Sequence, residues 1–97
     1  MGVVQTSRAA YREVRDGLGP RQLKVLEAIE HSSGGITNNE LARELRWPIN
    51  CVTPRVFELR SAGVVALVGK RQDRWTGKRS CVWGRVQGAQ LEFEGFA

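Results

Sequence analysis

The sequence contains few of the residues that build metal centres or disulfide frameworks. Its two cysteines are Cys51 and Cys81, and its one histidine is His31. A structural zinc site needs about four ligands at short spacings, which these residues do not supply. Two distant cysteines are typical of free thiols in a reducing compartment. We therefore expect no metal and no cofactor.

Long apolar runs are also missing. No stretch approaches the roughly 18 consecutive apolar residues of a membrane-spanning helix. Residues 1–6 lack both the charged start and the apolar segment of a signal peptide. The chain of 97 residues is too short for two ordinary domains. These features predict one cytoplasmic domain that does not associate with a membrane.

The sequence offers no recognisable catalytic constellation. An enzyme needs a nucleophile with a base, a pair of carboxylates or a metal cluster. His31 stands alone in a segment that ends a helix, His31-Ser32-Ser33-Gly34-Gly35, and no other reactive groups converge in the pattern. We expect a protein that is not an enzyme.

Acidic residues are almost absent from one region, and this sets the charge pattern. Residues 64–86 carry a net charge of +5 with Asp73 as their one acid, whereas residues 1–63 carry +2 and residues 87–97 carry −2. A basic segment on a nearly neutral body indicates a polyanionic partner, most often nucleic acid. A charged loop that only contacts solvent is the alternative.

Apolar residues at helical spacing predict four helices, over residues 6–18, 20–31, 37–45 and 49–62. Thr37 and Glu40 have the spacing of a capping box, which starts the third helix. Pro54 complicates the fourth, because proline inside a helix removes a backbone hydrogen bond. Either the first turn of this helix is irregular, or regular helix begins at Pro54 with Thr53 as its cap.

A β-hairpin follows the helices. Residues 64–68 and 80–86 have the composition of strands, and residues 69–79 are expected to form the loop between them. Ile36 is a candidate for a single-residue strand that pairs with this hairpin. We divide the chain into an N-terminal helical segment (1–19), a main domain (20–86) and a C-terminal tail (87–97).

The order of these elements predicts an α+β fold, the winged helix-turn-helix. Three helices form its core, the hairpin forms the wing, and an extra helix precedes them. Residues 36–63 form the helix-turn-helix, because the turn at residues 46–48 has the short length that this motif requires. The second helix of such a motif fits the major groove of DNA.

Residues 36–65 resemble the helix-turn-helix of bacterial winged-helix regulators. The matching residues are Thr37, Glu40, Leu41, Ala42, Leu45, Val52, Val56, Leu59, Gly63 and Val65. Two positions differ, since such regulators often have glycine where Arg46 stands and seldom have proline at position 54. The resemblance implies a transcriptional regulator that binds double-stranded DNA.

A narrower resemblance, over residues 6–86, is to small winged-helix proteins encoded in phages and prophages. It adds motifs at the start of the chain, in the last helix and in the wing: Thr6-Ser7, Ala10-Tyr11-Arg12, Val52-Thr53-Pro54-Arg55, Thr76-Gly77-Lys78-Arg79 and Val82-Trp83. This likeness implies a regulator of phage or prophage type.

Three residues of the last helix are candidates for reading bases. Asn50 could bind adenine, Thr53 a base edge or a phosphate, and Arg55 guanine or a phosphate. Asn50 and Thr53 could instead serve as helix caps, and Arg55 could pair with Glu58 or Glu44. Phe57 also points outward, and packing against the wing is the favoured interpretation.

The wing supplies the remaining candidates for DNA contact, which are Arg71, Arg74, Trp75, Lys78 and Arg79. The cations are expected to contact phosphates or the minor groove. Trp75 could stack on a sugar or a base, or anchor the loop on its own hairpin. Trp47 and Trp83 are expected in the core.

Other partners stay open at this stage. A winged helix can also serve as a protein-binding subunit of a larger assembly, since fold alone does not settle function. RNA or unusual duplex forms are further candidates. A homodimer is possible, formed through residues 6–18 or 88–97, because both segments carry apolar residues beyond the predicted core.

Overall fold

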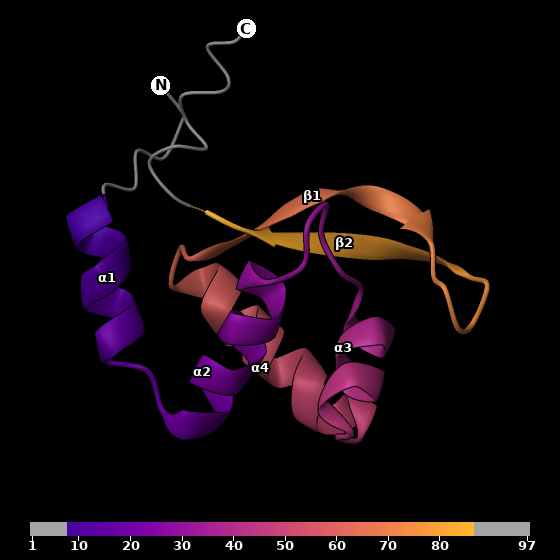
Figure 1. Ribbon diagram of the computed structural model, residues 1–97, viewed down its shortest axis with the longest axis horizontal. Helices are drawn as coiled ribbons and strands as arrows, with labels where there is room; N and C mark the ends of the chain where they lie inside the picture. The colour runs from indigo at the N-terminus through magenta and orange to yellow at the C-terminus, as the bar shows by residue number, and fades with distance from the viewer. Residues whose placement is uncertain (1–7, 87–97) are drawn as a thin grey trace, which may run out of the picture.

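A computed structural model describes residues 8–86 of the chain. Its elements are α1 (Arg8–Asp16), α2 (Pro20–Glu30), α3 (Asn38–Leu45), α4 (Ile49–Ser61), β1 (Val65–Gln72) and β2 (Arg79–Arg85). The hairpin lies along one side of the helices, its loop projects beyond α3, and α1 stands at the opposite end (Figure 1). This arrangement confirms the predicted winged helix-turn-helix with an extra N-terminal helix. The tail at residues 88–97 and the first residues of the predicted 6–18 helix lie outside the described residues.

The helix-turn-helix starts with the predicted capping box. The Thr37 hydroxyl accepts a hydrogen bond from the Glu40 N–H at 3.1 Å, and the Glu40 carboxylate accepts one from the Thr37 N–H at 3.2 Å. After α3, Arg46 adopts φ of 61°. This left-handed conformation is the one that glycine takes most easily at a helix end. Arg46 thus adopts the left-handed conformation that glycine often takes in the regulators whose helix-turn-helix the sequence resembles.

The fourth helix is continuous through Pro54. It begins at Ile49 after Pro48, which has extended backbone angles, and Pro54 lies inside it. Thr53 is therefore an internal helical residue, and the alternative in which it caps a helix starting at Pro54 is wrong. Proline is tolerated here because only the bond to the Asn50 carbonyl is lost, close to the helix start.

The hairpin is longer and its loop tighter than predicted. β1 runs to Gln72 instead of ending at residue 68, and Gln72 pairs with Arg79, the first residue of β2. The polar residues 70–72 lack the apolar alternation that marks a strand, yet the partner strand satisfies their backbone groups. The loop shrinks to residues 73–78. Ile36 forms the predicted bridge, pairing with Trp83.

The core lies where the helices meet the hairpin. It is formed by Tyr11, Val25, Leu26, Ala28, Ile29, Ile36, Leu41, Val52, Val56, Leu59, Val64, Val65 and Trp83. Trp83 is buried as expected, whereas Trp47 is half-buried at its edge. This packing leaves the outward face of α4 and the wing loop accessible.

Helix α1 is attached by a polar cluster as well as by apolar contacts. The Tyr11 hydroxyl donates to Glu30 at 2.7 Å, and Arg15 makes two hydrogen bonds of 3.0 Å to the same carboxylate. Burial raises the pKa of Glu30, but these hydrogen bonds outweigh it and the pKa is lowered.

Within residues 8–86, no helix has both the length and the apolar character to cross a bilayer.

Candidate nucleic-acid interface

The outward face of α4 carries polar and apolar residues in place of a row of cations. Asn50, Thr53, Pro54 and Phe57 are exposed. Phe57 is 68% exposed, so the expectation that it packs against the wing is wrong. Asn50 makes no capping hydrogen bond, because Pro48 occupies the cap position. Its side chain is available for an external partner.

Arg55 lies on the flank of α4 that faces α2. Its guanidinium donates to both carboxylate oxygens of Glu58, at 3.0 and 3.3 Å. Gln22 of α2 donates to Glu58 at 3.0 Å. The hydrogen bonds from Gln22 and Arg55 lower the pKa of Glu58. Arg55 would have to exchange this ion pair for a base or a phosphate.

The tip of the wing is a tight turn organised by Asp73. Its Oδ2 atom accepts from the backbone N–H groups of Trp75 and Thr76, at 2.9 and 2.8 Å. An aspartate that bonds to the backbone two residues ahead is a common way to shape a turn. The Asp73 N–H donates to the Lys78 carbonyl at 2.7 Å and closes the loop. Four exposed candidates for DNA contact stand on or beside this turn, which are Arg74, Trp75, Lys78 and Arg79.

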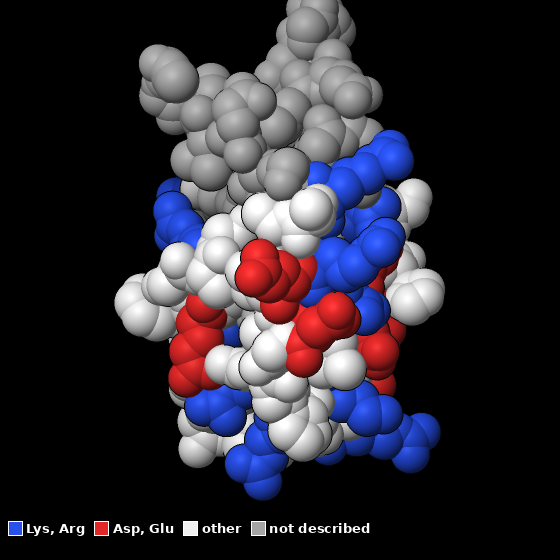
Figure 2. Space-filling view, turned by 90° about the vertical axis from the view of Figure 1, so that its left-hand side faces the viewer, with Lys and Arg blue, Asp and Glu red and all other residues white. Residues whose placement is uncertain are grey.

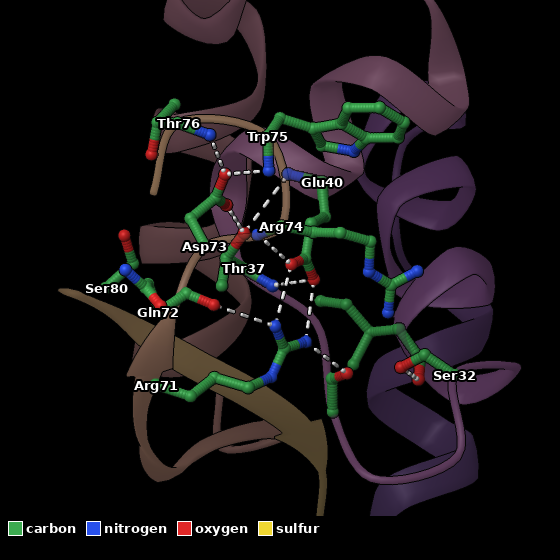
Figure 3. A network of polar contacts seen from close by, with 12 residues as sticks. Ser32, Thr37, Glu40, Arg71, Gln72, Asp73, Arg74, Trp75, Thr76 and Ser80 are labelled. Atoms are coloured by element: carbon green, nitrogen blue, oxygen red, sulfur yellow. Dashed lines mark hydrogen bonds and ion pairs between the residues drawn. The ribbon is translucent and has the colours of Figure 1, made fainter. Parts of the chain in front are cut away.

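A buried network ties the wing to the start of α3 (Figure 3). Glu40 is 6% exposed, and its carboxylate oxygens accept from Arg71 at 2.7 Å each. It also accepts from the Arg74 N–H at 3.1 Å. The side-chain hydrogen bond to Arg71, its largest influence, holds the pKa of Glu40 at about 2. The Thr37 hydroxyl donates to Asp73 and adds a second link between α3 and the wing.

This network changes the interpretation of Arg71. Its guanidinium also donates to the Gly35 carbonyl at 3.4 Å, so most of its hydrogen-bonding capacity is used inside the protein. Arg71 sits in the hairpin as predicted, but its neighbours give it a positioning role. The capping box identified Glu40 from sequence, yet no signal in the sequence shows that both of its carboxylate oxygens also bind a wing arginine.

The Trp75 ring contacts the helix-turn-helix. The Arg43 guanidinium of α3 lies over its ring, 4.0 Å from the centroid. A cation at this distance is attracted to the electron-rich ring face. Trp75 is still 55% exposed, so part of the ring is open to solvent. Sequence reasoning missed Arg43, because a partner 32 positions away in another element leaves no local pattern.

The end of the molecule formed by α1, opposite the wing loop, carries both positive and negative side chains. On the α1 side, Lys and Arg gather above and below a band that contains Asp and Glu (Figure 2). Arg8, Arg12, Arg15 and Arg85 there line a hollow together with Glu30 and Asp16. The wing loop, in contrast, carries exposed cations, and its one acid, Asp73, is buried.

Comparison with known proteins supports the fold. No protein-family model and no curated protein matches the chain. Among solved structures, the disulfide-formed structure of AbfR superposes with a TM-score of 0.58 at 22% sequence identity. The match covers 90% of this chain and 58% of AbfR, so the chain spans less than two thirds of that protein. The four helices followed by an antiparallel hairpin thus match the winged helix-turn-helix fold of that structure.

Proposed function

We propose that this protein binds double-stranded DNA and acts as a transcriptional regulator. The observation that carries the proposal is the exposed cationic turn at residues 73–79, held by a buried network beside an accessible helix-turn-helix. The likeness to AbfR supports the winged helix-turn-helix fold on which this proposal depends. The likeness to phage proteins stays a hypothesis from sequence, because the match to AbfR does not support it.

In this proposal α4 lies in the major groove and the wing follows the backbone or the minor groove. Asn50 and Thr53 contact base edges or a phosphate, and Arg55 does so after leaving Glu58. The wing residues Arg74, Lys78 and Arg79 contact phosphates, with Trp75 stacking on a sugar or base. Arg71 holds the wing in place. No catalytic role is proposed.

The salt dependence of binding tests this function. We expect weak binding to random-sequence duplex, measured by fluorescence anisotropy, with an affinity that falls steeply as salt rises. Replacing Lys78 and Arg79 together by alanine should lower the slope of log affinity against log salt by about two, because roughly 0.9 is lost per phosphate contact.

Arg8 and Arg12 supply the matched control, since they are exposed on α1 at the end away from the wing. Their double replacement by alanine removes the same charge and should leave the salt slope nearly unchanged. Equal effects of the two double variants would show that binding depends on the net charge of the protein and not on the position of the wing cations. No binding at low salt would contradict the proposal altogether.

A protein-binding winged helix is the second candidate. It is favoured by the exposed apolar side chains of α4, because Phe57 is 68% and Ile49 is 42% exposed. Apolar anchors of this kind are typical of protein interfaces. If duplex binding fails while Phe57→Ala lowers self-association or partner binding, this second function replaces the first.

A further inference from the structure

The hollow beside α1 carries an excess of positive charge. It has a volume of about 610 Å³, and α1, α2 and β2 each contribute to its lining. Four arginines and two acids stand there, so its side chains carry a net charge of +2 at neutral pH. These charged residues are Arg8, Arg12, Arg15, Arg85, Asp16 and Glu30. We call this site the α1 hollow.

The less exposed acid of the α1 hollow is already paired. The side chain of Glu30 is 11% exposed, and its carboxylate accepts from the Tyr11 hydroxyl and twice from Arg15. Asp16 is exposed at the end of α1, where water and salt screen its charge. Glu30 thus uses Arg15 as its partner and leaves the other three arginines without an acid.

These three arginines have no ionic partner in the part of the chain that the structure describes. Arg8, Arg12 and Arg85 are exposed, and none of them forms an ion pair within residues 8–86. Arg8 and Arg12 are one helical turn apart, so they share a face of α1. A guanidinium group binds a carboxylate with two parallel hydrogen bonds. The ligand that matches the hollow is therefore a pair of carboxylates.

The C-terminal tail supplies two carboxylates within reach. Residues 87–97 contain Glu92 and Glu94 but no lysine or arginine. Glu92 follows Arg85 by seven positions, and seven extended residues span up to about 23 Å. Helix α1 has nine residues and is only about 13 Å long. Both glutamates can therefore reach the arginines of the hollow from the end of β2.

The covalent link favours this tail over a separate acidic molecule. A ligand joined by a short flexible linker is present at an effective concentration in the millimolar range. Single exposed ion pairs are weak, so a free acidic peptide of this kind would bind poorly. The same weak pairs suffice for a segment that starts beside the site.

We propose that the C-terminal tail docks on the α1 hollow of its own chain, with Glu92 and Glu94 paired to the three free arginines. The two glutamates alternate with Leu91 and Phe93. In an extended segment the acids therefore face one side and the apolar residues the other. Docking through the acids neutralises the cations of this face, which leaves the wing loop as the cationic surface for a polyanion.

Paramagnetic broadening in ¹H–¹⁵N NMR of the full chain tests this docking. A nitroxide label is attached through Ala97→Cys, after Cys51→Ala and Cys81→Ala have removed the native thiols. At low salt the label should broaden the amide signals of α1 and Arg85, while the signals of the wing loop stay sharp. The broadening should fade as salt rises, because salt screens exposed ion pairs.

Charge removal on either side should release the tail. Glu92→Gln together with Glu94→Gln should reduce the broadening of the α1 signals about threefold, because exposed ion pairs of this strength are lost. Arg8→Gln together with Arg12→Gln should have the same effect. Both variants keep the apolar core, so their other amide signals should stay in place and show that the domain is folded.

The matched control is Glu13→Gln with Glu44→Gln, which removes the same charge from exposed positions outside the lining and should leave the broadening unchanged. Sharp α1 signals in the labelled chain would overturn the inference. Equal broadening with and without the two tail glutamates would mean that apolar side chains hold the tail. Broadening of an unlabelled ¹⁵N chain by an added labelled chain would mean docking on a second copy. Duplex is absent from this measurement, so each result leaves the proposed function as it stands.

Discussion

At the scale of the residue, Gly35 occupies a position where a side chain does not fit. Its φ is +96°, and a Cβ atom built there would lie 2.4 Å from Val82 Cγ1 and 3.1 Å from the Trp83 carbonyl oxygen. Ile36, the next residue, pairs with Trp83 and brings the chain close to β2. This close approach joins the segment before α3 to the hairpin.

We expect Gly35→Ala to lower the free energy of unfolding by roughly 2–4 kcal/mol, because overpacking and a strained φ act together. Urea denaturation followed by circular dichroism measures the change. Gly34→Ala is the matched control, since Gly34 has φ of +88° but open space around its Cβ position. It should cost only about 1–2 kcal/mol, from the backbone alone. Equal losses in both variants would show that packing against Val82 does not matter.

The roles of individual residues could be predicted from the sequence in some cases and not in others. Gly34 and Gly35 marked a turn, because two consecutive glycines break a helix, but nothing in the sequence separated the packed glycine from the open one. Arg71 was grouped with the wing cations, because its ion pair with Glu40 joins residues 31 positions apart. Thr37 and Glu40 were assigned correctly as a cap, since a capping box is local in sequence.

At the scale of the element, the link between α3 and the wing depends on a charged Glu40. The pKa of Glu40 is about 2, below its ordinary value of 4.5. A carboxylate whose pKa is lowered by folding stabilises the folded state fully at a pH above its ordinary pKa. This stabilisation is lost as the pH falls towards the pKa of the folded state. The link should therefore weaken between about pH 4.5 and pH 2. Asp73 acts in the same direction, because its hydrogen bonds outweigh burial and lower its pKa.

Glu40→Gln isolates this contribution. Glutamine keeps an acceptor for the Thr37 N–H but loses the charge that binds Arg71, so we expect a loss of about 1–3 kcal/mol at neutral pH. The free energy of unfolding of the variant should fall less steeply than that of the wild type between pH 4.5 and pH 2. Chemical denaturation at several pH values measures both slopes. Parallel curves would mean that Glu40 is not the group responsible.

The elements themselves were largely predictable. Helices and the turn at residues 46–48 follow from apolar spacing and caps, which are local signals. The ends of β1 and β2 could not be predicted in this way. Residues 70–72 become strand only because they pair with residues 79–81. In the candidate interface, the exposed wing cations followed from charge alone, whereas the place of Trp75 against Arg43 depends on tertiary packing.

At the scale of the whole molecule, the open question is assembly. One helix reads only a few base pairs, so useful specificity needs two half-sites and a dimer. The described part of the segment 6–18 is no longer a candidate for a dimer contact. Its apolar residues are used within the fold, because Tyr11 is buried and Val14 and Leu18 pack against the core. Residues 88–97, which lie outside the described residues, keep their apolar side chains as the other candidate.

We expect the full chain to sediment as a dimer at high concentration and the chain truncated after residue 87 to sediment as a monomer. The truncation removes Leu91, Phe93 and Phe96, whose burial would drive association. Phe57→Ala in the full chain is the control for an interface on α4 instead. A monomeric full chain, both free and bound to duplex, would contradict the expectation.

The hydrogen bond between Thr37 and Asp73 also bears on how the protein comes to be made. It joins residues 36 positions apart, and the Asp73 carboxylate that accepts it also shapes the turn at residues 73–76. Contacts this distant in sequence form late, since a long loop must close first. During synthesis the helices can pack while the hairpin is still inside the ribosome. The link from Thr37 to Asp73 can form only after Asp73 has emerged, so the wing, and with it the proposed hold on DNA, becomes fixed to α3 after that helix has been synthesised and capped.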